Sequence, residues 1–242
     1  MRLISLWGVV VLPVSSALAQ GGPPMLTDDP GTPGNRRWEV NIAFTVEESR
    51  AARTFGVPLI DANYGLGERL QLKIEAPWLV GGGENGLGNA LLGIKWRFLD
   101  EEAHGVALGL YPQIGFRAPA ASRKRGLGEP HGEYLLPLSA QKQIGPVSAN
   151  AEIGFAYRPH DRDEWVYGLA IGREVSERLE VIGEMFGSSP RTARQTDILL
   201  NIGLRGRLNK RLVLLLAAGT GLGNRTREKP RLLGYLGGQF LF

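Results

Sequence analysis

A strict alternation of apolar and polar side chains is the feature of this chain that most restricts its fold. In residues 69–76, Leu70, Leu72 and Ile74 alternate with charged or amide side chains. The same pattern returns in residues 90–98, 147–157 and 197–205. Successive side chains of a β-strand point to opposite faces of a sheet, so each segment has one apolar and one polar face. The sequence therefore predicts an all-β protein.

The connections between these segments distinguish a membrane barrel from a soluble sandwich. We expect twelve strands, near residues 36–46, 57–66, 69–79, 89–99, 105–117, 134–144, 147–157, 165–174, 178–187, 196–207, 211–221 and 231–242. Short connections alternate with longer polar or glycine-rich ones, the longer being 47–56, 80–88, 118–133, 158–164, 188–195 and 222–230. This rhythm is typical of outer-membrane barrels and is not expected of Greek-key sandwiches. The sequence thus predicts a transmembrane antiparallel up-and-down β-barrel over residues 36–242, with both termini and the short turns in the periplasm.

The two ends of the chain favour the same location, the bacterial outer membrane. Arg2, the apolar run 3–12 and the Ala17-Leu18-Ala19 site predict a signal peptide over residues 1–19. Residues 20–35 are rich in proline and glycine and cannot form a strand. They are either a flexible periplasmic leader or a partial plug that folds into the lumen. The last strand ends on Phe242, which fits the signal that the barrel-assembly machinery recognises.

Composition excludes several other classes of function. The 242 residues include no cysteine, which removes disulfides, cysteine-based metal sites and cysteine nucleophiles. The formal charge of +4 comes from scattered basic residues, so a nucleic-acid partner is not expected. His104, His131 and His160 fall in turns or loops, and none is expected beside a serine and an acid. The sequence predicts no enzyme, no metal site and no cofactor.

Alternation also assigns the side chains of each strand to the lipid or to the lumen. Leu72, Ile94, Ile153 and Leu200 are expected to contact lipid. Aromatic residues near strand ends are expected to form interfacial girdles, namely Trp38, Trp78, Trp96, Tyr157, Trp165 and Phe186. The predicted lumen-lining residues are Lys73, Glu75, Lys95, Arg97, Arg117, Glu152, Glu180, Glu184, Asp197 and Arg205. Most of the cations come from one side of the predicted barrel and most of the acids from the other.

A motif in the leader is shared with a known family. Its residues are Gly22, Pro23, Pro24, Thr27, Asp28, Asp29 and Pro30, and further matching segments are 37–40, 61–66, 70–77 and 86–98. The motif resembles the opening of the family called MetA-pathway of phenol degradation, a group of outer-membrane transport barrels. Met25 stands where that family usually has phenylalanine. The resemblance implies an outer-membrane barrel and does not identify its cargo.

Two functions are consistent with these observations. The first is a channel or passive transporter for small polar or charged solutes, aromatic acids among them, because opposed charges across a narrow water-filled bore favour such solutes. The second is a plugged structural or surface-interaction barrel without transport. Basic residues of two long loops also make lipopolysaccharide a candidate partner: Arg123, Lys124, Arg125, Arg225, Arg227 and Lys229.

Overall fold

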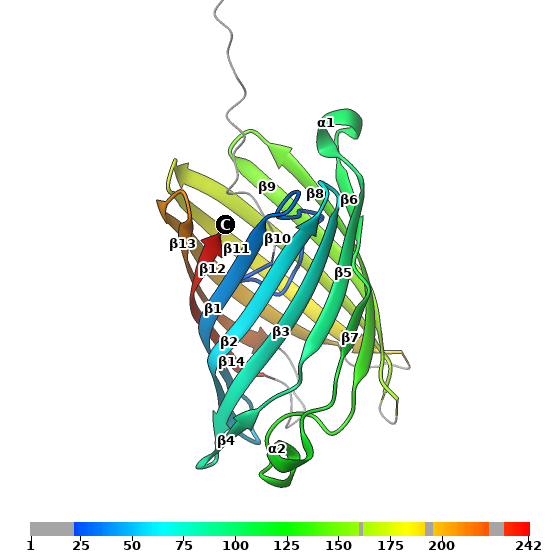
Figure 1. The fold of residues 1–242 in the computed structure, drawn as a ribbon, viewed down its shortest axis with the longest axis vertical. Helices are drawn as coiled ribbons and strands as arrows, with labels where there is room; N and C mark the ends of the chain where they lie inside the picture. Colours follow the sequence, from blue (N-terminus) through cyan, green and yellow to red (C-terminus); the bar gives the residue numbers. More distant parts are fainter. Residues whose placement is uncertain (1–21, 160–161, 192–195, 223–229) are drawn as a thin grey trace, which may run out of the picture.

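A computed structural model describes residues 22–159, 162–191, 196–222 and 230–242, which form one antiparallel barrel (Figure 1). The predicted signal peptide lies outside the described residues. The strands are β1 (Trp38–Glu48), β2 (Arg53–Leu66), β3 (Leu70–Gly81), β4 (Glu84–Leu87), β5 (Leu91–Leu99), β6 (Ala107–Leu110), β7 (Gln113–Gly115), β8 (Glu133–Ile144), β9 (Val147–Tyr157), β10 (Glu164–Ser176), β11 (Leu179–Pro190), β12 (Asp197–Asn209), β13 (Leu212–Leu222) and β14 (Leu232–Leu241). Two short helices, α1 (Glu101–His104) and α2 (Ala120–Lys124), lie in connections.

These segments make a closed barrel of twelve strands, as the sequence predicts. β4 and β5 both pair with β3 and follow one another along it, so they form one strand of the wall. β6 and β7 likewise lie along β8. The first and last strands close the sheet. At this seam Trp38 and Phe242 exchange two backbone hydrogen bonds, with N···O distances of 3.1 and 3.0 Å.

Three predicted segments differ from the structure. The strand expected at 105–117 is interrupted between β6 and β7 at Pro112, which has no N–H to donate to a ladder. The connection expected at 47–56 is shorter, because β1 extends to Glu48 and β2 begins at Arg53. The connection expected at 80–88 is mostly a hairpin. Gly82 and Gly83 have φ of 62° and 84°, as a two-residue turn with both central residues left-handed requires.

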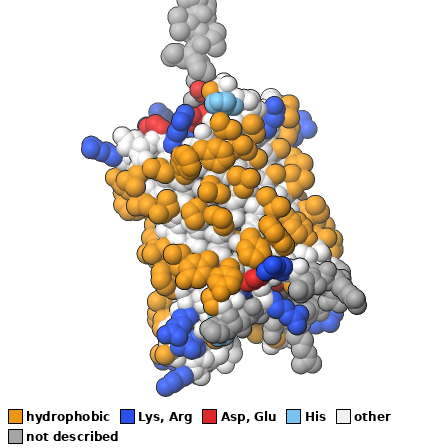
Figure 2. Space-filling model, turned by 90° about the vertical axis from the view of Figure 1, so that its right-hand side faces the viewer, with side chains coloured by type: hydrophobic (Ala, Val, Ile, Leu, Met, Phe, Trp, Pro, Cys, Tyr) orange, Lys and Arg blue, Asp and Glu red, His pale blue; other side chains and the backbone are white. Residues whose placement is uncertain are grey.

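The outer surface of the barrel is apolar and its inner surface is polar. Outward side chains such as Ile94 and Ile153 are more than half exposed, at 52% and 53%. Inward neighbours such as Lys95 and Glu152 are buried. Figure 2 shows hydrophobic side chains covering the middle of the wall, with charged residues gathered towards its two ends. Strands with an apolar outer face and a polar inner face match the surface that a bilayer requires. No helix in the described ranges is long and apolar enough to cross a membrane.

Most of the expected girdle aromatics face outward, with one exception. Trp38, Trp78, Trp96, Tyr157 and Trp165 are each more than two fifths exposed. Phe186 pairs directly with Gly168 and lies on the same side of β11 as the buried Ile182 and Glu184. Directly paired residues of an antiparallel ladder point to the same face. The prediction for Phe186 was therefore wrong: its ring points into the lumen.

Candidate functional site in the barrel lumen

The leader, defined here as residues 22–35, lies inside the barrel and contacts inward side chains from several strands (Figure 1). Near its end Thr32 donates to the Glu68 carbonyl at 2.8 Å, in the turn between β2 and β3. We call the end of the barrel that carries α1 and the C-terminus the short-turn end; α2 marks the long-loop end (Figure 1). The first residues of the leader form a tight turn. The Gly22 N–H donates to the Thr27 carbonyl at 2.8 Å, and the Met25 N–H donates to the Gly22 carbonyl at 2.9 Å.

Two glutamates of the wall accept hydrogen bonds from the leader backbone. Glu184 on β11 accepts from the N–H groups of Leu26, at 3.2 Å, and Thr27. Glu152 on β9 accepts from the Asp28 N–H at 3.1 Å. A turn outside regular structure leaves such donors without partners, and charged acceptors make stronger bonds than neutral ones. These two carboxylates therefore fix the leader against β9 and β11.

Arg205 on β12 holds the start of the leader. Its guanidinium donates to the Gly22 carbonyl at 2.9 Å and to the Pro23 carbonyl at 3.0 and 3.1 Å. Glu180 on β11 lies 3.4 Å from the same guanidinium, and both side chains are almost completely buried. Glu180 thus balances the charge of a cation whose donors are used by the leader.

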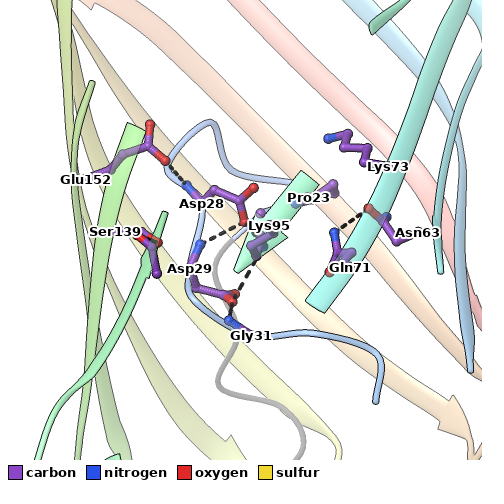
Figure 3. Close-up of polar contacts among 12 residues, drawn as sticks. Pro23, Asp28, Asp29, Gly31, Asn63, Gln71, Lys73, Lys95, Ser139 and Glu152 are labelled. Atoms are coloured by element: carbon purple, nitrogen blue, oxygen red, sulfur yellow. Dashed lines mark hydrogen bonds and ion pairs between the residues drawn. The ribbon is translucent and has the colours of Figure 1, made fainter. Parts of the chain in front are cut away.

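An ion pair ties the leader to a different part of the wall. The Lys95 Nζ on β5 lies 2.8 Å from Asp28 Oδ1 and 4.0 Å from Asp29 Oδ1 (Figure 3). Burial raises the pKa of the Asp28 carboxyl, but the ammonium groups of Lys95 and Lys73 outweigh burial, so this pKa lies below its usual value. Burial raises the pKa of the Asp29 carboxyl above its usual value, and Asp28 adds to that effect. Asp28 is therefore the residue of the leader motif that stays ionised most readily.

Several inward glycines make room for the leader. A Cβ on Gly168 would lie 2.2 Å from Thr27 Oγ1, and a Cβ on Gly203 would lie 2.2 Å from Met25 Cε. Pro30 packs in the same way over Gly109. Met25 also packs against Ala170 and Ile182. At these three positions the missing side chain leaves the space that the leader occupies.

A polar network lines the wall beside the leader. Lys73 contacts Glu75 at 3.1 Å and Asp61 at 3.5 Å, and Gln71 donates to Asn63 at 2.6 Å. A cavity of about 30 Å³ separates this wall from the leader. Such a volume holds about one or two water molecules. At this level the space beside the leader is too small for an organic solute.

The remaining predicted lumen residues lie nearer the two mouths of the barrel. Arg97 points inward at the short-turn end and pairs with Asp100 at 2.8 Å. Asp197 lies at the long-loop end of β12, paired in register with Ser188. Arg117 is exposed in the connection after β7. Because β7 ends at Gly115, the alternation of the strand no longer assigns Arg117 to a face.

A second, larger cavity lies between the leader and the long-loop end. Its volume is about 280 Å³, and we call it the outer chamber. Inward apolar residues form its belt: Leu135, Val166, Phe186 and Leu199. Charged residues surround them: Glu133, Arg158, Glu164 and Asp197. Sequence reasoning missed this chamber, although apolar residues at inward positions of β10, β11 and β12 were the available signal.

The basic loop residues proposed for lipopolysaccharide are only partly placed. Arg123 donates to the Ala118 carbonyl at 3.0 Å, and Arg125 donates to the Asn85 carbonyl at 2.7 Å. Lys124 is exposed at the end of α2. Arg225, Arg227 and Lys229 lie outside the described residues. Arg123 and Arg125 are therefore already engaged in hydrogen bonds within the protein.

Comparison with solved structures finds the same fold in bacterial outer-membrane channels. The COG4313 outer membrane channel from Pseudomonas putida F1 has a TM-score of 0.68 at 12% identity, over 92% of this chain and 100% of that one. The NanC porin has a TM-score of 0.61 at 8% identity, over 83% and 98% of the two chains. The KdgM porin has a TM-score of 0.58 at 11% identity, over 84% and 99%.

Comparisons of sequence are negative. No family model matches the chain, and no curated protein matches it. The resemblance of the leader motif to the MetA-pathway family is therefore not confirmed, and the likeness that is found is one of fold, to outer-membrane β-barrels. The apolar exterior and the shared fold together place the protein in the bacterial outer membrane.

Proposed function

We propose that the protein is an outer-membrane channel for small polar or charged solutes, and that the leader is a plug that must move before they pass. The observation that carries this proposal is the docking of the leader by Lys95, Glu152, Glu184 and Arg205. These contacts are hydrogen bonds and ion pairs, which water and ions can replace when the plug leaves. A wall lined by such side chains then remains as a hydrated, charged bore.

The size of the barrel supports a channel. Twelve strands enclose more space than an eight-stranded barrel, whose interior side chains fill, and less than a 16-stranded porin. The leader occupies the lumen space that a twelve-stranded barrel has beyond that of an eight-stranded one, since only a water-sized cavity remains beside it. The second candidate, a permanently plugged structural barrel, is favoured by the apolar contact of Met25 with Ala170 and Ile182. The two functions differ in whether the plug moves.

Partners follow from the same proposal. The exposed wall binds the lipid bilayer, Phe242 serves as the signal for the barrel-assembly machinery, and the long loops contact lipopolysaccharide. Lys124 is an exposed cation of the placed loop. Its Gln variant, combined with Arg225, Arg227 and Lys229 changed to Gln, should weaken lipopolysaccharide binding in a pull-down. Unchanged binding would leave these residues as solvated loop charge.

Single-channel recording in planar bilayers tests the plug. Gly168→Ala places a methyl group against Thr27 and should displace the leader, so its conductance should exceed that of the wild type several-fold. Gly183→Ala is the matched control, because a Cβ at Gly183 on the neighbouring strand meets no atom within 4 Å. A chain lacking residues 22–32 should conduct most. If wild type, Gly168→Ala and the deletion are all silent while the barrels are folded, transport is excluded.

A further inference from the structure

Two positive charges lie on the outer, lipid-facing surface of the barrel wall. Lys142 is on the same side of β8 as Ile144, which is 62% exposed, and Arg173 is on the same side of β10 as Val175, which is 55% exposed. Leaving aside the first and last residue of each strand, the outer face of the described strands carries no other charged side chain. Cations are unfavourable on a surface that faces hydrocarbon, so these two mark a place where the wall meets a polar group.

The register of the sheet brings the two cations close together. Lys142 on β8 is paired with Ala149 on β9, and Ala149 is paired with Ile171 on β10. Arg173 lies two positions beyond Ile171, towards the short-turn end. Two strand spacings and two residues along a strand put the Cα atoms of Lys142 and Arg173 about 12 Å apart. Their long side chains can therefore meet at a single group between them.

The tilt of the strands, visible in Figure 1, places both cations at a similar depth in the membrane. With a tilt of about 35–45°, the change in depth from β8 to β10 along the register is cancelled by two residues along β10. Apolar Ile144 and Val175 lie beyond the cations on the same strands. Long basic side chains at such a depth extend along the apolar wall towards the lipid headgroups.

The donors of both cations are unused within the described part of the chain. Neither the Lys142 ammonium nor the Arg173 guanidinium makes a hydrogen bond or an ion pair with any described residue. Other basic residues at the short-turn end differ in this respect, since Arg69 and Arg97 both pair with Asp100. Lys142 and Arg173 therefore retain their donors for a molecule in the membrane.

Short side chains lie next to the two cations, on the side towards the middle of the bilayer. Ala140 on β8 is paired with Ala151 on β9, and Ala149 shares the outer face of β9 with Ala151. Ile153 and Leu169 border these alanines and are 53% and 42% exposed. An acyl chain can therefore approach the backbone of the wall more closely over the alanines than over the neighbouring side chains.

We propose that Lys142 and Arg173 bind the phosphate group of an anionic phospholipid, and that an acyl chain of this lipid lies over Ala140, Ala149 and Ala151. Phosphate oxygens accept the charge-assisted hydrogen bonds that both side chains donate. A lipid with a net negative charge suits two cations better than a zwitterionic lipid, whose own ammonium group repels them. The short turns are expected to face the periplasm, so the lipid belongs to the inner leaflet of the outer membrane. This site lies outside the wall and does not depend on the proposed movement of the plug.

Native mass spectrometry of the full-length barrel, released from detergent micelles, tests the site. Palmitoyl-oleoyl phosphatidylglycerol and palmitoyl-oleoyl phosphatidylcholine serve as probes, because they share both acyl chains and differ in net charge. We expect a one-to-one complex with phosphatidylglycerol and at least fivefold weaker binding of phosphatidylcholine. Equal binding of the two lipids overturns the proposal. Tighter binding of lipid A than of phosphatidylglycerol also overturns it, and so does a dimer of the barrel that excludes the lipid.

Paired variants locate the site. Lys142→Gln with Arg173→Gln should weaken phosphatidylglycerol at least fivefold and leave phosphatidylcholine unchanged. Arg178→Gln with Lys210→Gln is the matched control, because it removes two exposed cations from short turns at the same end of the barrel. Equal weakening by the two pairs would mean that the lipid responds only to the total charge of this end, and it overturns the assignment.

A further variant tests the acyl chain separately from the charges. Ala149→Trp keeps both cations and should weaken phosphatidylglycerol several-fold, whereas Ile94→Trp, on the outer face of β5, should leave its binding unchanged. Heat modifiability on gels shows that each variant is folded, and removal of outward charges should not reduce it. Binding by Ala149→Trp equal to that of Ile94→Trp overturns the placement of the acyl chain.

Discussion

Lys95 and Asp28 meet inside the barrel, with Lys95 Nζ 2.8 Å from Asp28 Oδ1, although 67 positions separate them in the chain. The same Asp28 uses its backbone N–H to reach Glu152 on β9. One residue of the leader thus connects two parts of the wall, one basic and one acidic (Figure 3). The sequence predicts that cations and acids lie on different sides of the wall, and the leader connects these two sides.

Removing the cation of this pair should loosen the leader. Lys95→Gln leaves the Asp28 carboxylate inside the barrel without its ammonium, and breaking one side of a buried pair costs on the order of 3 kcal/mol. We expect faster hydrogen exchange at the Thr27 amide and a higher open probability in bilayers. The double variant Lys95→Gln with Asp28→Asn should recover part of the protection, because position 28 then carries no charge that lacks its ammonium. A double variant that exchanges faster than Lys95→Gln contradicts this assignment.

Acid should release the leader only at low pH. The pKa of Asp28 is lowered below its ordinary value of 3.8, so its docking contribution is complete above that pH and is lost as pH falls through the lower folded value. The pKa of Asp29 is raised, so Asp29 is protonated earlier without breaking the closer Lys95 contact. Conductance should stay constant from pH 7 to about pH 4 and rise below it. Asp28→Asn should abolish that rise.

A cation on the outer face should prevent insertion. Leu200 is 41% exposed on the outer side of β12, where an arginine near the middle of the bilayer costs about 2–4 kcal/mol. Leu200→Arg should therefore reduce the yield of heat-modifiable, folded barrel. The adjacent Asn201 faces inward and donates to Glu184, so Asn201→Arg places its charge beside an acid and should fold better. Equal yields would mean that the faces are assigned wrongly.

Surface labelling should distinguish the two ends of the barrel. Lys124 lies in α2 at the long-loop end, and Gly145 lies in the short turn between β8 and β9. In outer-membrane barrels the longer loops face outward. An epitope tag at Lys124 should be accessible on intact cells, and a tag at Gly145 should become accessible only after permeabilisation. The reverse result would invert the topology.

The alternation of apolar and polar residues predicted the wall of this barrel well, because the residues of one strand are enough to show which side chains share a face. Leu200 and Glu184 could be assigned from neighbours two residues away. The position of the leader could not be assigned in this way, because it depends on Arg205 and Glu184, which lie more than 150 positions further along the chain. Phe186 was misplaced for a related reason: an aromatic near a strand end fits a girdle or a chamber, and only its pairing with Gly168 decides between them.

The seam between β1 and β14 has a consequence for biogenesis. The leader leads through two residues into Trp38, the residue that pairs with Phe242, so the plug is tethered at the seam where the first and last strands meet. Its seat combines side chains from β5, β9, β11 and β12, and these converge only when the sheet has curved round on itself. An unfinished barrel consequently has no seat for its plug. Closure of the sheet and docking of the leader therefore occur together, so that no closed barrel with an open bore forms during assembly.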